Sequence, residues 1–245
     1  LLFDSNRLKQ LTQELKSERF KKVDFSIDSN ARAQRELVPI SSLIYDLDQF
    51  PDENWLPSWD AWGNHIVHTT ESLWWNALAF AFHRDKEAGE YAKNVLLTLS
   101  RWKDWANPWQ TKRGRFADHR TGTWSHRVAL TYDLVYELMS GEERAIARKA
   151  IMQNIIQGVH RTFVFDNNIT GNTSNWIAMT VGGSLMNMAA IFDDEPGTEQ
   201  LEPYFTGAVM KYYSFINKVT GGKDGGWGEG IGYNEYSFSN MSLNI

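Results

Sequence analysis

Hydrophobic residues recur every three or four positions along most of the chain, and the strict alternation typical of strands is absent. Residues 6–20 carry a stripe of leucines and predict an opening helix. Residues 21–60 lack such a stripe, and we expect a loop-rich N-terminal segment there, because proline interrupts long helices. Three prolines fall in this stretch: Pro39, Pro51 and Pro57.

The helical pattern becomes regular within residues 61–245, where it comes in pairs of helices joined by short polar links. Ser140 followed three residues later by Glu143 predicts a capped helix start. Three antiparallel hairpins are expected: residues 71–83 with 87–105, residues 124–138 with 142–159, and residues 174–192 with 199–219.

Serial helical hairpins of this size build either an open solenoid or a closed α/α toroid. The loops of this chain are rich in Trp, His, Arg and Gly, which favours the toroid, because a toroid gathers its loops at one end of a concave face. The predicted fold class is therefore all-α, as an incomplete α/α toroid in one domain over residues 1–245. Residues 233–245 have the pattern of a further helix without a C-terminal cap, so we expect the natural protein to continue.

The composition excludes several kinds of site. Because the chain contains no Cys, it forms no disulfides, Cys-based zinc sites or thiol nucleophiles. A net charge of −5 argues against a nucleic-acid partner, and no apolar run is long enough to make the chain a membrane protein. We expect no cofactor and no metal, since His65 and His68 lack a matching third ligand nearby.

The chain holds 11 Trp residues, an unusually high number. Flat aromatic faces suit sugar rings, whose axial C–H groups form apolar patches. Most single Trp residues are nevertheless expected to fill space between helices, so only their clustering suggests a carbohydrate ligand.

Two further segments are candidates for a binding site. Residues 224–236 contain several glycines together with acidic residues, one Trp and two Tyr. A glycine-rich segment of this kind indicates turns or a close approach of the backbone to a ligand. Residues 166–174 are rich in Asn and Gly and lead into a helix that Asn175 and Trp176 open. These residues suit turns and N-caps, and a carboxamide at a helix N-terminus equally suits an anion.

A basic stretch lies in the middle of this acidic chain. Residues 112–120 hold five basic side chains, His119 and Arg120 among them, and Trp124 and His126 follow. Such a stretch is either a solvated loop or the lining of a groove for an anionic sugar chain.

The order of these motifs resembles that of heparinase II/III-type polysaccharide lyases, together with the related alginate lyases and uronyl epimerases. The Asn-Trp helix start precedes an Asp-Gly-Gly-x-x-Glu-Gly-x-x-Tyr-x-x-Tyr segment at residues 224–236. Three further landmarks agree with the family: the Leu2-Phe3-Asp4 start, the Ala-x-x-Tyr-Asp-x-x-Tyr helix at 129–136 and the Ser-x-Glu-Glu-Arg cap at 140–144.

The resemblance implies an N-terminal α/α toroid followed, beyond residue 245, by a β-sandwich region of the same protein. It further implies that the protein cleaves an acidic, uronate-containing polysaccharide by β-elimination, in the periplasm or outside the cell. Asn175 matches the amide that neutralises the substrate carboxylate, and Tyr233 matches the base that takes the C5 proton. The other substrate contacts are expected from Trp176, His119, Arg120, Trp124, His126, Trp227, Glu229 and Tyr236.

This chemistry places demands on both residues. The C5 proton of a uronate is weakly acidic, so the enzyme must stabilise the negative charge that builds up on the carboxylate. A free Tyr titrates near pH ~10 and needs a cationic or hydrogen-bonding neighbour before it acts as a base. No His follows His160, so the motif set is closer to heparinase III-type sites than to heparinase II-type sites.

Three alternative functions remain open at the level of sequence. In an α/α-toroid glycoside hydrolase, Glu229 with Asp224 or Asp118 would form the acid/base pair. A uronyl C5-epimerase would share the proton abstraction and return the proton to the other face. A non-catalytic glycan-binding domain would use the Trp residues and the basic stretch without needing Tyr233.

Overall fold

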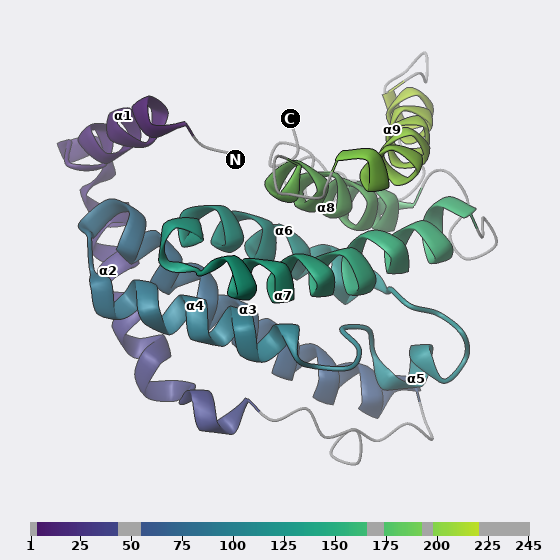
Figure 1. Cartoon of the computed structure of the whole chain (residues 1–245), viewed down its shortest axis with the longest axis horizontal. Coiled ribbons are helices and arrows are strands. Elements are labelled where there is room, and N and C mark those ends of the chain that lie inside the picture. Colours follow the sequence, from purple (N-terminus) through teal and green to yellow (C-terminus); the bar gives the residue numbers. More distant parts are fainter. Residues whose placement is uncertain (1–3, 44–54, 166–173, 193–197, 221–245) are drawn as a thin grey trace.

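The computed structural model describes residues 4–43, 55–165, 174–192 and 198–220, and every regular element in these ranges is helical. The predicted all-α class is therefore confirmed. In Figure 1 the helices follow one another across the molecule, from α1 and α2 on one side to α8 and α9 on the other. The described helices form an array of hairpins, and its closure into a toroid stays a prediction.

The N-terminal part contains α1 (Ser5–Leu15), the turn η1 (Glu18–Phe20), α2 (Lys21–Leu37) and the turn η2 (Ile40–Ser42). The middle of the chain contains α3 (Trp55–His83), α4 (Lys86–Ser100), α5 (Pro108–Thr111), α6 (His119–Leu134) and η4 (Tyr136–Leu138). The remaining described elements are α7 (Gly141–Ile151), the π-helical segments η5 (Met152–Gln157) and η6 (His160–Phe165), α8 (Asn175–Ile191) and α9 (Thr198–Thr220).

The expectation of a loop-rich segment over residues 21–60 is wrong. α2 occupies 17 of these residues and ends at Leu37, two residues before Pro39. α3 already begins at Trp55, so Pro57 lies in its first turn. The N–H groups of a first turn have no partner within the helix, and proline therefore costs little at such a position.

The first and third predicted hairpins are present with shifted ends, as α3 packs on α4 and α8 on α9, whereas in the second α7 follows α6 but packs on α4. α3 and α4 turn around Arg84, which takes the left-handed conformation with φ 59° and closes α3. The Arg84 N–H donates to the Phe80 carbonyl and the Asp85 N–H to the Ala79 carbonyl, a pattern that terminates helices. The Asp85 carboxylate then caps α4 by accepting from the Ala88 N–H at 3.0 Å. The predicted Ser140–Glu143 capping box at the start of α7 is also present.

α3, α6 and α8 run side by side in the same direction. Arg120 near the start of α6 lies over Trp59 near the start of α3, and Arg127 further along α6 reaches Glu71 further along α3. α6 and α8 keep the same order, as the site description shows below. The N-terminal ends of these three helices consequently lie together. Parallel inner helices of this kind are what a toroid requires, although they do not by themselves close one.

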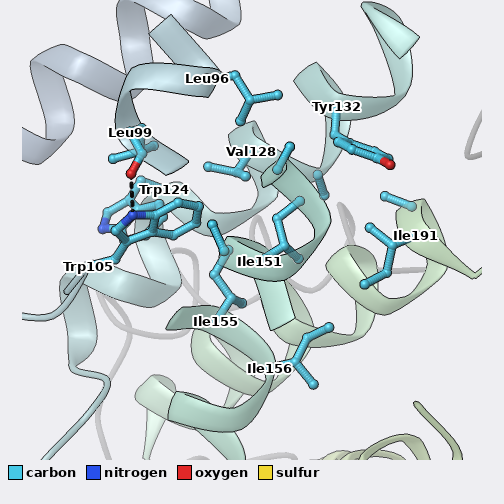
Figure 2. Packing of buried hydrophobic residues seen from close by; sticks show 14 of the residues in the cluster. Leu96, Leu99, Trp105, Trp124, Val128, Tyr132, Ile151, Ile155, Ile156 and Ile191 are labelled. Carbon is cyan, nitrogen blue, oxygen red and sulfur yellow. Dashed lines mark hydrogen bonds between the residues drawn. The ribbon is translucent and has the colours of Figure 1, made fainter. Parts of the chain in front are cut away.

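The main core lies between these three helices and the layer formed by α4, α7 and the π-helical segments. Figure 2 shows Trp105 and Trp124 meeting edge to face, with ring centroids 5.6 Å apart. The Trp105 indole N–H donates to the Leu99 carbonyl at 2.8 Å, which satisfies its polar atom inside the core. A smaller cluster joins α1 and α2 to α3, with Trp75 packed against it.

Candidate functional site

The start of α6 is held by the buried carboxylate of Asp118, which is 1% exposed. Asp118 accepts hydrogen bonds from the backbone N–H groups of Arg120 at 2.7 Å, Thr121 at 3.2 Å and Asn107 at 3.0 Å. Burial raises the pKa of Asp118, while these three bonds and nearby Arg120 act in the opposite direction. Asp118 thus fixes the loop and the helix start, and it does not present an acid to a substrate as the hydrolase alternative requires.

α6 and α8 touch through glycines at two successive turns. A Cβ atom on Gly122 would lie 2.8 Å from both the Met179 Cβ and the Thr180 backbone nitrogen. A Cβ atom on Gly183 would lie 2.0 Å from the Ser125 Oγ. Since no real Cβ atom tolerates such distances, the two helices approach this closely only because both positions are glycine. α8 contains several Gly, Ala and Ser residues, and small side chains suit this close contact.

A buried amide fixes the register of the same helix pair. The Asn187 side chain donates to the Ser125 carbonyl on α6 at 2.9 Å and to the Gly183 carbonyl on α8 at 2.8 Å. The glycine contacts and this bridge together set which residues of α6 and α8 meet at their N-terminal ends.

Three aromatic rings meet at that end, one from each of the three parallel helices. The His119 ring lies 5.7 Å from the Trp59 ring and 5.3 Å from the Trp176 ring, measured between centroids. The two indoles lie 6.3 Å apart and are inclined by only 18°. All three side chains are partly exposed. We call this group, together with Arg120, the ring cluster.

The Arg120 side chain lies against Trp59 and Gly63 of α3. Its Cζ lies 5.1 Å from the centroid of the Trp59 ring, close enough for a cation–π contact. A Cβ atom on Gly63 would lie 2.8 Å from the Arg120 Nε, so an alanine there would make the guanidinium shift from this position. The Nε atom is buried without a hydrogen-bond partner, and Arg120 makes no salt bridge to another described residue.

Both predicted site histidines are neutral at pH 7. Burial, together with the charge of Arg120, lowers the pKa of His119 to about 4. Burial, together with the charge of Arg127, lowers the pKa of His126 to about 4, against a weaker opposing effect of a hydrogen bond to the Gly122 backbone. Neither imidazole supplies positive charge near neutral pH, so any cationic assistance at this end comes from arginine.

Asn175 is the first residue of α8, directly after the N-cap Ser174. The Ser174 hydroxyl accepts from the Trp176 N–H at 3.3 Å and donates to the Asn175 Oδ1 at 3.4 Å. Asn175 is only 3% exposed, so its carboxamide lies beneath the surface at the helix end. It directly precedes Trp176 of the ring cluster in the chain, at a helix N-terminus whose partial positive charge favours an anion.

The prediction that Trp124 contacts substrate is corrected. Trp124 is 0% exposed and belongs to the main core, where it packs against Trp105. It lies on the inner face of α6 together with Val128 and Tyr132, one and two turns later, a spacing already present in the sequence. The ring of Trp124 offers no surface to a sugar.

The basic stretch is mostly engaged with its own surroundings. The Arg113 guanidinium stacks on the Trp109 ring at 3.8 Å, and Arg115 donates to the Gln110 Oε1 at 3.1 Å. Arg161 of η6 stacks on Phe116 at 3.9 Å, which ties the loop to the π-helical segment. Of the predicted basic contacts, the structure brings Arg120 and His119 into the ring cluster.

Four predicted site residues lie outside the described residues, namely Tyr233, Trp227, Glu229 and Tyr236. The same holds for Asp224. Their roles stay predictions.

In the part of the chain that is described, no three His, Asp or Glu side chains gather closely enough to hold a metal ion. His65 instead stacks on Trp102, with centroids 5.1 Å apart, and burial lowers its pKa. None of the helices in the described ranges is both long and apolar enough to cross a membrane.

Two cavities lie away from the ring cluster. The larger, of about 720 Å³, is bounded by α1 and by the C-terminal ends of α3 and α6. The smaller, of about 250 Å³, lies between α7, η5 and the start of α9. Neither includes a residue that the sequence predicted for the site.

The residue that the sequence analysis missed is Trp59. It was assigned to a loop because of Pro57, yet Trp59, Trp62 and Ile66 follow one another at helical spacing. That period was the available signal. Comparison with other proteins adds no assignment, since no protein-family model and no curated protein matches this chain.

Proposed function

We propose that this chain is the helical domain of a polysaccharide lyase that cleaves a uronate-containing glycan by β-elimination. In this mechanism Asn175 neutralises the substrate carboxylate and Tyr233 takes the C5 proton and returns it to the leaving oxygen. The observation that carries the proposal is the position of Asn175 at the helix end where the ring cluster and Arg120 also lie.

The arrangement of the helices supports a meeting of Asn175 with Tyr233. α3, α6 and α8 all begin at the same end of the molecule. If residues 233–245 form the next helix of this row, as their pattern predicts, Tyr233 begins that helix at the same end. The two groups would then converge although 57 residues separate them.

The chemistry matches the electrostatics of this end. A carboxylate that gains charge during proton abstraction is stabilised by an amide donor, by helix N-termini and by a nearby guanidinium. Because His119 and His126 are neutral near pH 7, Arg120 is the described cation that can lower the pKa of a neighbouring phenol. Asn175 is buried, so the mechanism also requires the end of α8 to open to substrate.

The direct test is ultraviolet absorbance of the products, since elimination leaves an unsaturated uronic ring and hydrolysis does not. The full natural protein is incubated with heparan sulfate, heparin, chondroitin, hyaluronan and alginate. We expect absorbance to rise with one of them, to vanish in Tyr233→Phe, and to fall by about 10²–10³-fold in kcat for Asn175→Ala. Cleavage without a rise in absorbance would show that the protein is a hydrolase and not a lyase. Deuterium uptake at C5 without cleavage would show that it is an epimerase.

The convergence itself is testable by cross-linking, because the chain contains no Cys of its own. With cysteines at Ser174 and Glu235, a short bis-maleimide should link the two positions. A matched pair with cysteines at Phe192 and Glu235 should not react, since Phe192 is exposed at the other end of α8. Linking of the second pair instead of the first would refute the shared helix end.

A further inference from the structure

We propose that the ring cluster is a subsite that binds one acidic pyranose ring of the substrate. Trp59, His119 and Trp176 contact the ring, and Arg120 pairs with its carboxylate or sulfate. The inference rests on the proposed function and adds Trp59, on a helix that the sequence did not predict at this position.

The three rings come from three separate helices and lie next to one another. Their centroids lie between 5.3 and 6.3 Å apart. Trp62, Trp105 and Trp124 are fully buried, whereas Trp59 and Trp176 remain partly exposed, Trp176 with part of its ring packed against the main core. Partly exposed, neighbouring aromatic faces suit the C–H patches of a sugar ring.

Arg120 gives this surface a preference for anions. Its guanidinium lies over Trp59 and against Gly63, and its Nε is buried without a hydrogen-bond partner. A cation that is partly removed from water and not paired with a described acid gains from a carboxylate or sulfate partner. His119 beside it is neutral near pH 7, so its ring adds an uncharged aromatic face next to Arg120.

The first test concerns Trp59. Binding is measured by calorimetry in the Tyr233→Phe background, so that turnover does not interfere. The probes are hexasaccharides of hyaluronan, heparan sulfate and alginate, with cellohexaose as the uncharged comparison. We expect Trp59→Ala to weaken binding of the best acidic probe about tenfold, the size of one lost aromatic contact.

Trp75→Ala is the matched control. Trp75 is partly buried on the same helix, sixteen residues and roughly 24 Å further along, where it packs against the small cluster of α1 and α2. It should change stability without changing binding. Equal binding by Trp59→Ala and the parent, with both variants folded by circular dichroism, would overturn the subsite, as would an absence of binding to every probe.

The second test separates charge from shape. Arg120→Gln should weaken the acidic probes about tenfold and leave cellohexaose unchanged. Gly63→Ala keeps both Arg120 and Trp59 but fills the space under the guanidinium. It should therefore weaken the acidic probes in the same direction. Unaltered acidic binding in Arg120→Gln would refute the anion contact.

The outcomes distinguish this inference from the lyase itself. If the natural protein produces no unsaturated products but Trp59 is still required for binding, the lyase proposal fails and the subsite stands. If unsaturated products form and Trp59→Ala leaves both binding and KM unchanged, the subsite fails and the lyase stands.

Discussion

Gly122→Ala should destabilise the protein by forcing α6 and α8 apart. The added Cβ would lie 2.8 Å from the Met179 Cβ and the Thr180 nitrogen, about 0.6 Å inside ordinary contact at 3.4 Å. Since one of these atoms is backbone, no rotamer change relieves the clash. Overpacking of this kind costs roughly 1–3 kcal/mol, of which the better helix propensity of Ala offsets at most about 1 kcal/mol.

A net loss of about 1–2 kcal/mol lowers the Tm of a domain of this size by roughly 2–8 °C. Thermal unfolding followed by circular dichroism measures it. Gly141→Ala is the control, because a Cβ at this first residue of α7 has open space around it. Its Tm should stay equal or rise slightly. If Gly122→Ala melted like Gly141→Ala, the close contact that sets the α6–α8 register would be refuted.

Two further predictions concern the histidines and the core. His119 and His126 have pKa values of about 4 in the folded protein against an ordinary 6.5, so the unfolded chain binds protons first as the pH falls. The stability contributed by the two neutral histidines is therefore complete above pH 6.5 and is lost as the pH falls toward 4, by up to about 1.4 kcal/mol per pH unit for each residue. Between pH 7.5 and 5, the Tm should fall less steeply in His126→Gln than in the parent protein. An equal dependence of Tm on pH in both proteins would contradict the burial effect. Trp124→Ala should cost about 3–5 kcal/mol in urea unfolding, whereas Trp109→Ala, at a partly exposed position, should cost clearly less; equal losses would contradict the core position of Trp124.

Helix ends marked by local chemistry were predictable from sequence, and those decided by tertiary contacts were not. Ser140 with Glu143, and Ser174 before Asn175, carry their own capping groups, so the starts of α7 and α8 were found. α2 was missed because the prolines that follow it favoured a loop over the whole stretch, although Val23, Ile27 and Ala31 stand four residues apart and the last two are buried. Helices of this kind depend on packing against a neighbour, here α3, rather than on their own pattern.

The site shows the same division. A sequence shows that Trp124 and His119 lie near each other in the chain, but only the rotation of α6 determines that Trp124 faces the core while His119 faces the ring cluster. Gly63 and Gly122 gave no signal of their own, because their meaning lies in the atoms of other helices that approach them. The neutral state of His119 likewise follows from burial and from Arg120, neither of which composition reveals.

The direction of the helices explains why chemistry gathers at one end of this fold. When every second helix runs the same way, the N-terminal ends of α3, α6 and α8 face the same side, and their partial positive charges add to Arg120. An anionic ligand gains from all of them at once, whereas the C-terminal ends present carbonyl groups. The larger cavity lies at those C-terminal ends, and its lining combines the acids Asp24, Asp133 and Glu137 with the bases Lys9, Lys16 and Arg84, so its charges do not favour an anion. Under the proposed function, helix polarity and Arg120 therefore favour the N-terminal ends of α3, α6 and α8, rather than the larger cavity, for an acidic sugar.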